Sequence, residues 1–423
     1  MNFPSLEKSV FRLFLIPLFA AIILPSVVGA EQRKWSDAKG VAEIRAQFVR
    51  FDQEFVVLRT ERDSVLRVQE AGLSSGDRAY LESIREKKRQ SHFATEAAGN
   101  AGWQIRREYS QKIRGRYELK IDYPSLKAKE WVWFAARPPR IDSQNVQSNL
   151  FPNSQSITDK SPNRRLMWRA RSQPDPTSPG KGSIAFVVGG ELYSRHLVKS
   201  PQSIRPYSTP SFADRKRFTQ ASEIYDFESK EFQAWLRKME LVRDSKKEGQ
   251  IAFAQRVFLT ITRNFDYLYE REMNRKVSHV CQVGKSDCGG LSNLIVSVLR
   301  SNGVPARALA GRWAESSTPG DTLNGVPYTQ YHVKAEFFAE GVGWVPLDMA
   351  RGVSQSSDPD RLAHFGKDNG DFVTMHTDYG LVVDTIHFGT KTIRILQGTS
   401  YWVAGSGDLD GKRREETWIV DSI

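Results

Sequence analysis

Cysteine is scarce in this sequence, which has only Cys281 and Cys288 among its 423 residues. A framework of several disulfides is therefore excluded, because domains of that kind need many more cysteines. Two cysteines seven positions apart leave two interpretations open. They form one structural disulfide, or Cys288 carries thiol chemistry while Cys281 is a buried free thiol or a resolving thiol.

Clusters of metal ligands are also lacking. The chain has seven histidines, and those other than His332 show no spacing that is typical of metal ligands. Asp408, Asp410 and Gly411 resemble part of a calcium-binding loop, but the remaining ligands of such a loop are missing. We therefore predict a turn there, and we expect the protein to use no metal and no cofactor.

Long hydrophobic runs are confined to the first thirty residues. Lys8 and Arg12 precede an apolar run over residues 14–28, and small residues follow it up to Ala30. This layout predicts a secretory signal peptide over residues 1–30, cleaved after Ala30. The alternative is an uncleaved membrane anchor facing outward, because the run is only slightly shorter than the ~18 residues that a span needs. We expect an exported protein, either periplasmic, cell-surface or secreted.

Acidic residues are too few to balance the basic ones. The chain has 49 Asp and Glu against 61 Lys and Arg, so its formal net charge is +12. Such a surface concentrates anionic polymers near it, and for an exported protein these would be envelope polymers, with nucleic acid not expected as a partner. The basic clusters are scattered, however, so solubility alone also explains the excess. Nothing in the sequence indicates the oligomeric state.

The length of the chain predicts two or three domains. The spacing of apolar residues predicts that the first of them is helical. Over residues 31–98, apolar residues recur at alternating spacings of four and three between Ile44 and Val65, which is typical of a packed helix. The charged residues 78–89 then predict a second helix that folds back on the first. We predict a coiled-coil-like helical hairpin that serves as a spacer or in self-association.

Residues 101–210 have the pattern of a β-rich domain. Apolar and charged residues alternate over 117–123, an apolar cluster covers 131–134, and an apolar run covers 184–188. Alternation with a period of two is typical of strands that have one wet face. Prolines interrupt the segment often, so we predict a small β-sandwich with long loops.

Residues 211–423 are predicted to form the catalytic domain, together with C-terminal strands. Helical spacing returns over residues 229–242 and 251–261. The chain as a whole is therefore predicted to be α+β, with the helical hairpin and the β-sandwich preceding the catalytic domain.

The most informative motif is Asp287-Cys288-Gly289-Gly290, which opens a predicted helix. Apolar residues share one face over residues 291–299, so the helix begins close to Cys288. A thiol among the unpaired N–H groups of a helix N-terminus is expected to ionise readily, and the thiolate is the nucleophile. Gly289 and Gly290 let a substrate backbone approach the sulfur, while the Cys288 N–H contributes to an oxyanion hole.

A base and an orienting acid follow later in the chain. His332 stands in a predicted strand over residues 331–337, and Asp348 ends another over 344–348. On neighbouring antiparallel strands the two side chains come within hydrogen-bonding reach. His332 would then exchange a proton with the thiol, and Asp348 would hold the imidazole in the useful tautomer.

These residues resemble the transglutaminase-like superfamily, whose core is a papain-like thiol fold. The resemblance rests on 287–289, 303–307, His332 and 343–348, and it covers about residues 245–352. It implies that Cys288 is the nucleophile, that His332 is the base and that Asp348 orients it. It also implies a protein or peptide amide as the substrate. An aromatic oxyanion donor is harder to identify, and Tyr267 is the candidate that the sequence offers.

We therefore predict an exported transglutaminase-like cysteine enzyme. It would form a thioester from an amide and transfer the acyl group to an amine or to water. A first alternative is a cysteine peptidase or isopeptidase that acts on envelope material. A second is a non-catalytic surface-binding module, which a stable disulfide between Cys281 and Cys288 would favour because an oxidised sulfur cannot attack.

Overall fold

The computed structural model describes residues 32–201, 206–270, 272–355 and 361–423. They fall into two compact units, Met1–Phe93 and Ala94–Ile423. The predicted signal peptide, residues 1–30, lies outside the described residues. Within the described ranges, no helix is long and apolar enough to cross a membrane.

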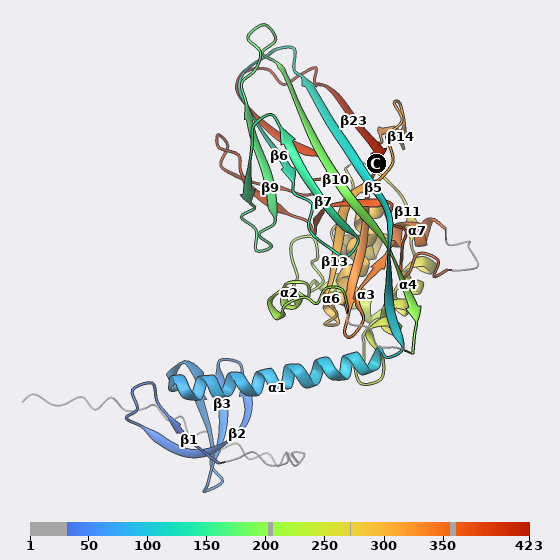
Figure 1. The fold of residues 1–423 in the computed structure, drawn as a ribbon. Coiled ribbons are helices and arrows are strands. Elements are labelled where there is room, and N and C mark those ends of the chain that lie inside the picture. The colour runs from blue at the N-terminus through green and yellow to red at the C-terminus, as the bar shows by residue number, and fades with distance from the viewer. Residues whose placement is uncertain (1–31, 202–205, 271, 356–360) are drawn as a thin grey trace, which may run out of the picture. The chain divides into compact units, whose positions relative to one another are not determined.

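The first unit is a small antiparallel sheet (Figure 1). Its sheet order is β1 (Arg33–Ser36), β2 (Glu43–Asp52), β3 (Phe55–Thr60) and β4 (Val65–Gln69). A short 3-10 helix, Glu70–Gly72, leads into α1 (Ser75–Gly99), whose last residues belong to the second unit. Trp35, Val56 and Leu58 pack in the core of this sheet together with Leu81 of α1.

The predicted helical hairpin is wrong in its first half, because residues 43–60 form strands. Ile44, Ala46 and Phe48 follow a period of two, and then a bulge between Phe48 and Arg50 shifts the register by one residue. A bulge followed by a tight turn converts strand alternation into spacings of three and four. The pattern therefore imitates a helix. The charged residues 78–89 do lie in a helix, α1.

The second unit contains two packed sheets that share one core. The first has the order β18-β10-β5-β23, with β7 also paired to β10. The second has the order β22-β6-β9-β8. The bounds are β5 (Trp103–Asp122), β6 (Leu126–Ala136), β7 (Gln144–Phe151), β8 (Ser154–Thr158), β9 (Leu166–Ser172), β10 (Lys181–Lys199), β18 (Lys367–Asp368), β22 (Thr399–Gly407) and β23 (Arg413–Ser422). Trp131 and Trp133, stacked at 5.2 Å, belong to the core between the sheets.

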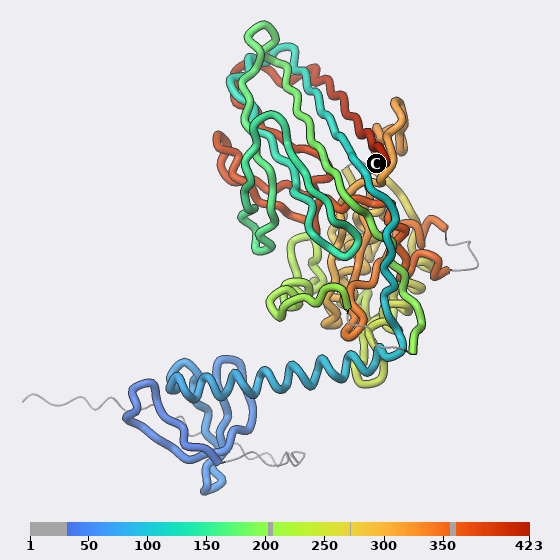
Figure 2. Tube along the Cα trace, viewed as in Figure 1, coloured from blue at the N-terminus to red at the C-terminus, as the bar shows by residue number. Residues whose placement is uncertain are grey.

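The C-terminal strands complete this sandwich, whereas the sequence assigned them to the catalytic domain. β22 pairs with β6, and β23 pairs with β5, so that Trp418 lies opposite Tyr117. Figure 2 shows the red C-terminal strand running beside the cyan β5. The sandwich is thus built from two distant parts of the chain, and alternation within each strand carries no information about its partner.

A third sheet carries the catalytic segment, with the order β17-β16-β13-β19. Its strands are β13 (Ala306–Trp313), β16 (Tyr331–Ala339), β17 (Gly343–Leu347) and β19 (Phe372–Thr377). The helices are α2 (Phe212–Arg217), α3 (Lys230–Lys238), α4 (Gln250–Asn264), α5 (Val277–Val283), α6 (Cys288–Ser301) and α7 (Met349–Ser354). Short strand pairs join β11 (Asp266–Tyr267) to β12 (Lys285–Ser286), β14 (Thr322–Leu323) to β15 (Val326–Pro327), and β20 (Leu381–Asp384) to β21 (Thr390–Ile393).

Helix α6 packs against the third sheet because β16 is apolar on one face. Val333, Ala335 and Phe337 share a buried cluster with the apolar residues of α6. The alternate residues His332, Lys334 and Glu336 face the other way, as the period of a strand requires. The predicted α+β class is confirmed, with β-structure also in the first unit.

Candidate active site

Helix α6 places Cys288 at its first residue. Asp287 is the N-cap, and its carboxylate accepts a hydrogen bond from the N–H of Gly290 at 3.0 Å. The same carboxylate accepts hydrogen bonds from Nε and Nη2 of Arg275, at distances between 2.7 and 3.0 Å. Because Asp287 is buried and held on two sides, the start of the helix is fixed, and with it the half-buried Cys288.

His332 and Asp348 meet on neighbouring antiparallel strands. β16 and β17 pair with Ala335 opposite Leu347, which puts the residue after β17 beside the start of β16. Nε2 of His332 lies 3.1 and 3.0 Å from the two carboxylate oxygens of Asp348. Asp348 also accepts a hydrogen bond from the N–H of Arg351 at 3.1 Å, as the N-cap of α7. No described residue bonds to Nδ1, so this nitrogen is left for another group.

Aromatic side chains hold the imidazole of His332 in place. The ring stacks on Trp313 with centroids 4.6 Å apart and planes inclined by 24°. Phe372 meets it edge-on at 6.2 Å, from the next strand but one. Gln397 donates from Nε2 to the carbonyl oxygen of His332 at 2.7 Å. The position of the ring is therefore set by packing as well as by Asp348.

Cys288 and His332 line one cavity of about 450 Å³. Asp348 is 3% exposed and stands behind His332, outside the lining residues. Gly289 lines the cavity, and so do five tyrosines, namely Tyr267, Tyr269, Tyr328, Tyr331 and Tyr379. The structure thus brings the three predicted catalytic residues together, the sulfur and imidazole at the cavity wall and the carboxylate beneath them.

The surroundings of the Cys288 thiol raise its pKa. Burial disfavours the charged sulfur most, and the Asp287 carboxylate adds to this effect. A hydrogen bond from the backbone of Val333 and the charge of Arg275 act in the opposite direction, but they are weaker. The sequence led us to expect a thiol that ionises readily. Burial and the neighbouring carboxylate act against that expectation, because both favour the neutral thiol.

The pKa of Asp348 is lowered, whereas that of Cys288 is raised. Burial alone would raise the pKa of its carboxyl group, but the charge of His332 and the hydrogen bond from its ring hold that pKa well below the ordinary value. The carboxylate therefore stays ionised and accepts the Nε2 proton, which is the geometry that keeps Nδ1 unprotonated in the neutral ring.

The two glycines after Cys288 serve different contacts. A Cβ on Gly289 would lie 2.7 Å from the hydroxyl oxygen of Tyr379, at the cavity wall. A Cβ on Gly290 would lie 1.9 Å from Oγ of Ser286, and Gly290 does not line the cavity. Gly289 is thus placed where the sequence predicted an approach to the sulfur, whereas Gly290 is required by packing inside the protein.

Tyr379 is a site residue that the sequence did not reveal. Its side chain is 7% exposed, and its hydroxyl has no hydrogen-bond partner among the described residues. Burial raises the pKa of this hydroxyl well above its ordinary value, and so do Asp287 and Cys288 nearby. A buried hydroxyl without a partner is costly, so its place beside the sulfur requires an explanation. No motif in the sequence connects Tyr379 to Cys288.

Asp378 fixes the backbone that carries Tyr379. It lies in the left-handed region with φ 56° and accepts both 2.8 Å bonds of a buried pair with Arg300. It also accepts hydrogen bonds from the Tyr225 hydroxyl at 3.0 Å and from the N–H of Ala308 at 3.2 Å. Breaking such a buried pair costs about 3–5 kcal/mol, so the position of the tyrosine is firmly set.

Neither cysteine is oxidised in the structure. Cys281 is buried in α5 and Cys288 is half-buried, and both are free thiols. The disulfide that would favour a binding module is therefore not formed here. Across the described ranges, no group of three or more His, Cys, Asp or Glu side chains is arranged to hold a metal ion.

A thiol on a helix that faces a histidine and its acidic partner on a sheet is the arrangement of papain-like thiol cores. Residues 239–349 match the model of the transglutaminase-like superfamily, which confirms the resemblance predicted for about residues 245–352. The matched segment contains Cys288, His332 and Asp348.

The solved structures to which this chain is similar are distant. A protein from Cytophaga hutchinsonii that is assigned as a cysteine protease has a TM-score of 0.45 and 11% identity, over 75% of this chain and 93% of that chain. The periplasmic domain of TgpA from Pseudomonas aeruginosa, bound to ethylmercury, has a TM-score of 0.30 and 16% identity, over 59% of this chain and 93% of that chain. These likenesses are too weak to carry a functional conclusion. No curated protein sequence matches the chain.

Proposed function

We propose that this protein is a cysteine enzyme that converts an amide into a thioester on Cys288 and passes the acyl group to an amine or to water. One observation supports this most directly. Cys288 and His332 line the same cavity, and the bond from Nε2 to Asp348 leaves Nδ1 of His332 for the thiol proton. The export predicted from residues 1–30 is part of this proposal.

The reaction follows from the three side chains. The Sγ–H proton of Cys288 passes to Nδ1 of His332 as the sulfur attacks the amide carbonyl carbon. Asp348, ionised, stabilises the imidazolium that results. The tetrahedral intermediate collapses with cleavage of the C–N bond, and the leaving amine or ammonia takes the proton from His332. An amine or water, deprotonated by His332, then attacks the thioester and restores the thiol.

Two groups are suited to stabilise the oxyanion of the intermediate. The N–H of Cys288 lies in the first turn of α6, where no preceding helical carbonyl is available to accept it. The unpartnered hydroxyl of Tyr379 lies beside Gly289, the next residue along. We assign Tyr379 rather than Tyr267 to this role, because only the Tyr379 hydroxyl is both buried and unsatisfied before substrate binds.

Tyr379→Phe is therefore expected to lower the kcat for amide turnover about 100-fold, because one oxyanion donor is lost. Alkylation of Cys288 by iodoacetamide forms no oxyanion, so its rate should change by no more than about threefold. Tyr267→Phe is the matched control and is expected to keep both rates. Steady-state kinetics and timed mass spectrometry measure the two. An equal loss of turnover and alkylation in Tyr379→Phe would reduce this residue to a structural role.

Product analysis tests the proposed function and separates its branches. The protein is incubated with a glutamine-containing protein whose lysines are blocked by methylation, and with a fluorescent primary amine. Transfer would attach the amine and release ammonia in equal amounts, whereas hydrolysis would release ammonia without attaching the amine. Peptide-bond cleavage would instead shorten the protein. Envelope material is assayed in the same way, with Cys288→Ala as the background. The absence of every product that depends on Cys288, on both substrates, would reject the proposal.

A further inference from the structure

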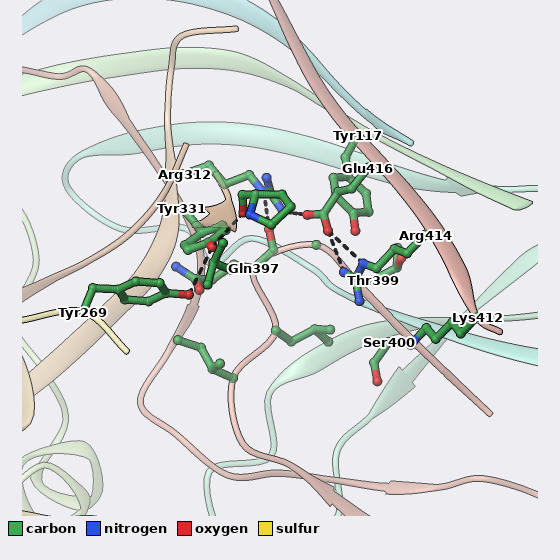
Figure 3. A pocket seen from close by; sticks show the side chains of 15 residues that line it. Tyr117, Tyr269, Arg312, Tyr331, Gln397, Thr399, Ser400, Lys412, Arg414 and Glu416 are labelled. Carbon is green, nitrogen blue, oxygen red and sulfur yellow. Dashed lines mark hydrogen bonds and ion pairs between the residues drawn. The ribbon is translucent and has the colours of Figure 1, made fainter. Parts of the chain in front are cut away.

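A second cavity, of about 620 Å³, adjoins the catalytic one. Tyr269, Tyr331, Ile395 and Gln397 line both cavities. Figure 3 shows this second cavity, with Tyr269 and Tyr331 at one side and Lys412 and Arg414 at the other. The two tyrosine hydroxyls lie 3.2 Å apart and form part of the shared wall. The second cavity therefore lies directly beside the one that contains Cys288.

The sandwich supplies the far side of the second cavity. β23 pairs with β5, and its alternate residues Arg414 and Glu416 line this cavity, while Arg413, the residue before Arg414, does not line it. Lys412 directly precedes the strand and lines the same cavity. The cavity therefore depends on the pairing of the C-terminal strand with a strand near the start of the unit.

The charged residues of this cavity leave an excess of positive charge. Arg312, Lys412 and Arg414 face a single carboxylate, Glu416, which lies 2.8 Å from Arg312 and 2.6 Å from Arg414. Burial would raise the pKa of Glu416, but the two arginines lower it to about 2, so it stays ionised. Two positive charges thus remain uncompensated within the cavity.

Two of the three cations are available to a ligand. Arg312 is 2% exposed, and its guanidinium is occupied by Gln397, Thr329 and Glu416. The side chain of Arg414 is 42% exposed, and its Nε and Nη2 atoms donate hydrogen bonds to Glu416. Lys412 forms no ion pair with any residue in the described part of the chain.

We propose that this cavity is a subsite for an acidic residue of the amide substrate, a few residues away from the reactive amide. A carboxylate there would meet Lys412 and Arg414, whereas the ammonium group of an amine would be repelled. The cavity therefore selects the acyl donor and not the acceptor. This inference rests on the proposed function, because it supposes that the reactive amide lies at Cys288.

Matched peptide probes test the subsite. A short peptide with a chloromethyl ketone, which alkylates Cys288, is made with glutamate or with glutamine at each of the positions flanking the reactive group. We expect the wild-type protein to be labelled about tenfold faster by the best glutamate peptide than by its glutamine counterpart at low ionic strength. The ratio should fall toward one as salt is added, because the charges are partly exposed.

Three variants test which basic residues cause the preference for glutamate. Lys412→Gln should reduce the glutamate preference to about twofold or less, while Arg414→Lys, which keeps the charge, should retain most of it. Arg413→Gln is the matched control: it removes the same charge from the residue adjacent to Lys412, which is 79% exposed and does not line the cavity. It should leave the preference unchanged.

The outcomes separate the subsite from the chemistry. If iodoacetamide labels Cys288 but the wild-type protein shows no glutamate preference at any position, the subsite is rejected and the cysteine chemistry stands. The subsite is also rejected if Arg413→Gln lowers the preference as much as Lys412→Gln does. Failure of iodoacetamide itself to label Cys288 would reject the proposed function.

Discussion

Replacing Cys288 with alanine is expected to lower amide turnover at least about 10⁴-fold and to remove rapid labelling by iodoacetamide. Cys288 is the thiol that lines the cavity with His332, whereas Cys281 is buried elsewhere. The Cys281 thiol donates a hydrogen bond to the carbonyl of Ser278 at 3.3 Å. Burial and the nearby Asp226 raise the pKa of Cys281 to about 12, so it has little thiolate at neutral pH. Mass spectrometry of peptides after timed exposure shows which thiol reacts.

Cys281→Ala is the natural control, since it removes the other of the two cysteines. It is expected to keep both turnover and the labelling of Cys288. Thermal melting should show that Cys288→Ala is folded, because the substitution removes one sulfur atom from a half-buried position. Rapid labelling at Cys281 in the Cys288→Ala protein, or undiminished turnover without Cys288, would contradict the assigned nucleophile.

The local parts of the catalytic segment could be predicted from the sequence. The helix after Cys288 follows from apolar residues at helical spacing and from Asp287 as its cap, and α6 begins at Cys288. His332 and Asp348 each stand at the end of a recognisable strand, and the turn between β16 and β17 makes those strands neighbours. Short connections convert nearness in sequence into nearness in space.

The rest depends on contacts between distant segments. The bulge in β2 changes the apparent period of residues 43–60, and no residue in the sequence announces it. β23 pairs with β5 across the whole length of the unit, so the far side of the second cavity was invisible in the sequence. Tyr379 lines the cavity together with Cys288, and its neighbour Asp378 is held by Arg300 of α6, a contact between segments far apart in the chain. The raised pKa of Cys288 likewise follows from burial, which a motif does not report.

His332→Gln is expected to lower amide turnover at neutral pH about 10³-fold, because the base that takes the thiol proton is lost. Burial raises the pKa of the Cys288 thiol, so the thiolate is scarce at neutral pH and becomes abundant only as the pH rises toward that pKa. In this variant, alkylation by iodoacetamide should therefore be slow at pH 7 and increase about tenfold for each pH unit. The wild-type rate should depend far less on pH. The measurement is the alkylation rate of Cys288 across the pH range in which the protein stays folded.

Asp348→Asn separates the charge of the acid from its orienting role. An asparagine oxygen still accepts the Nε2–H of His332, so Nδ1 should keep its direction, while the imidazolium loses the carboxylate that stabilises it. We expect the turnover of Asp348→Asn to lie between that of His332→Gln and that of the wild type. Its alkylation rate should depend on pH more steeply than the wild-type rate does, but less steeply than the rate of His332→Gln.

A pH profile of alkylation in His332→Gln that matches the wild-type profile would show that the thiolate forms without the imidazole. In that case burial would not control the reactivity of Cys288, and the sulfur would be activated by the helix N-terminus and Val333 alone.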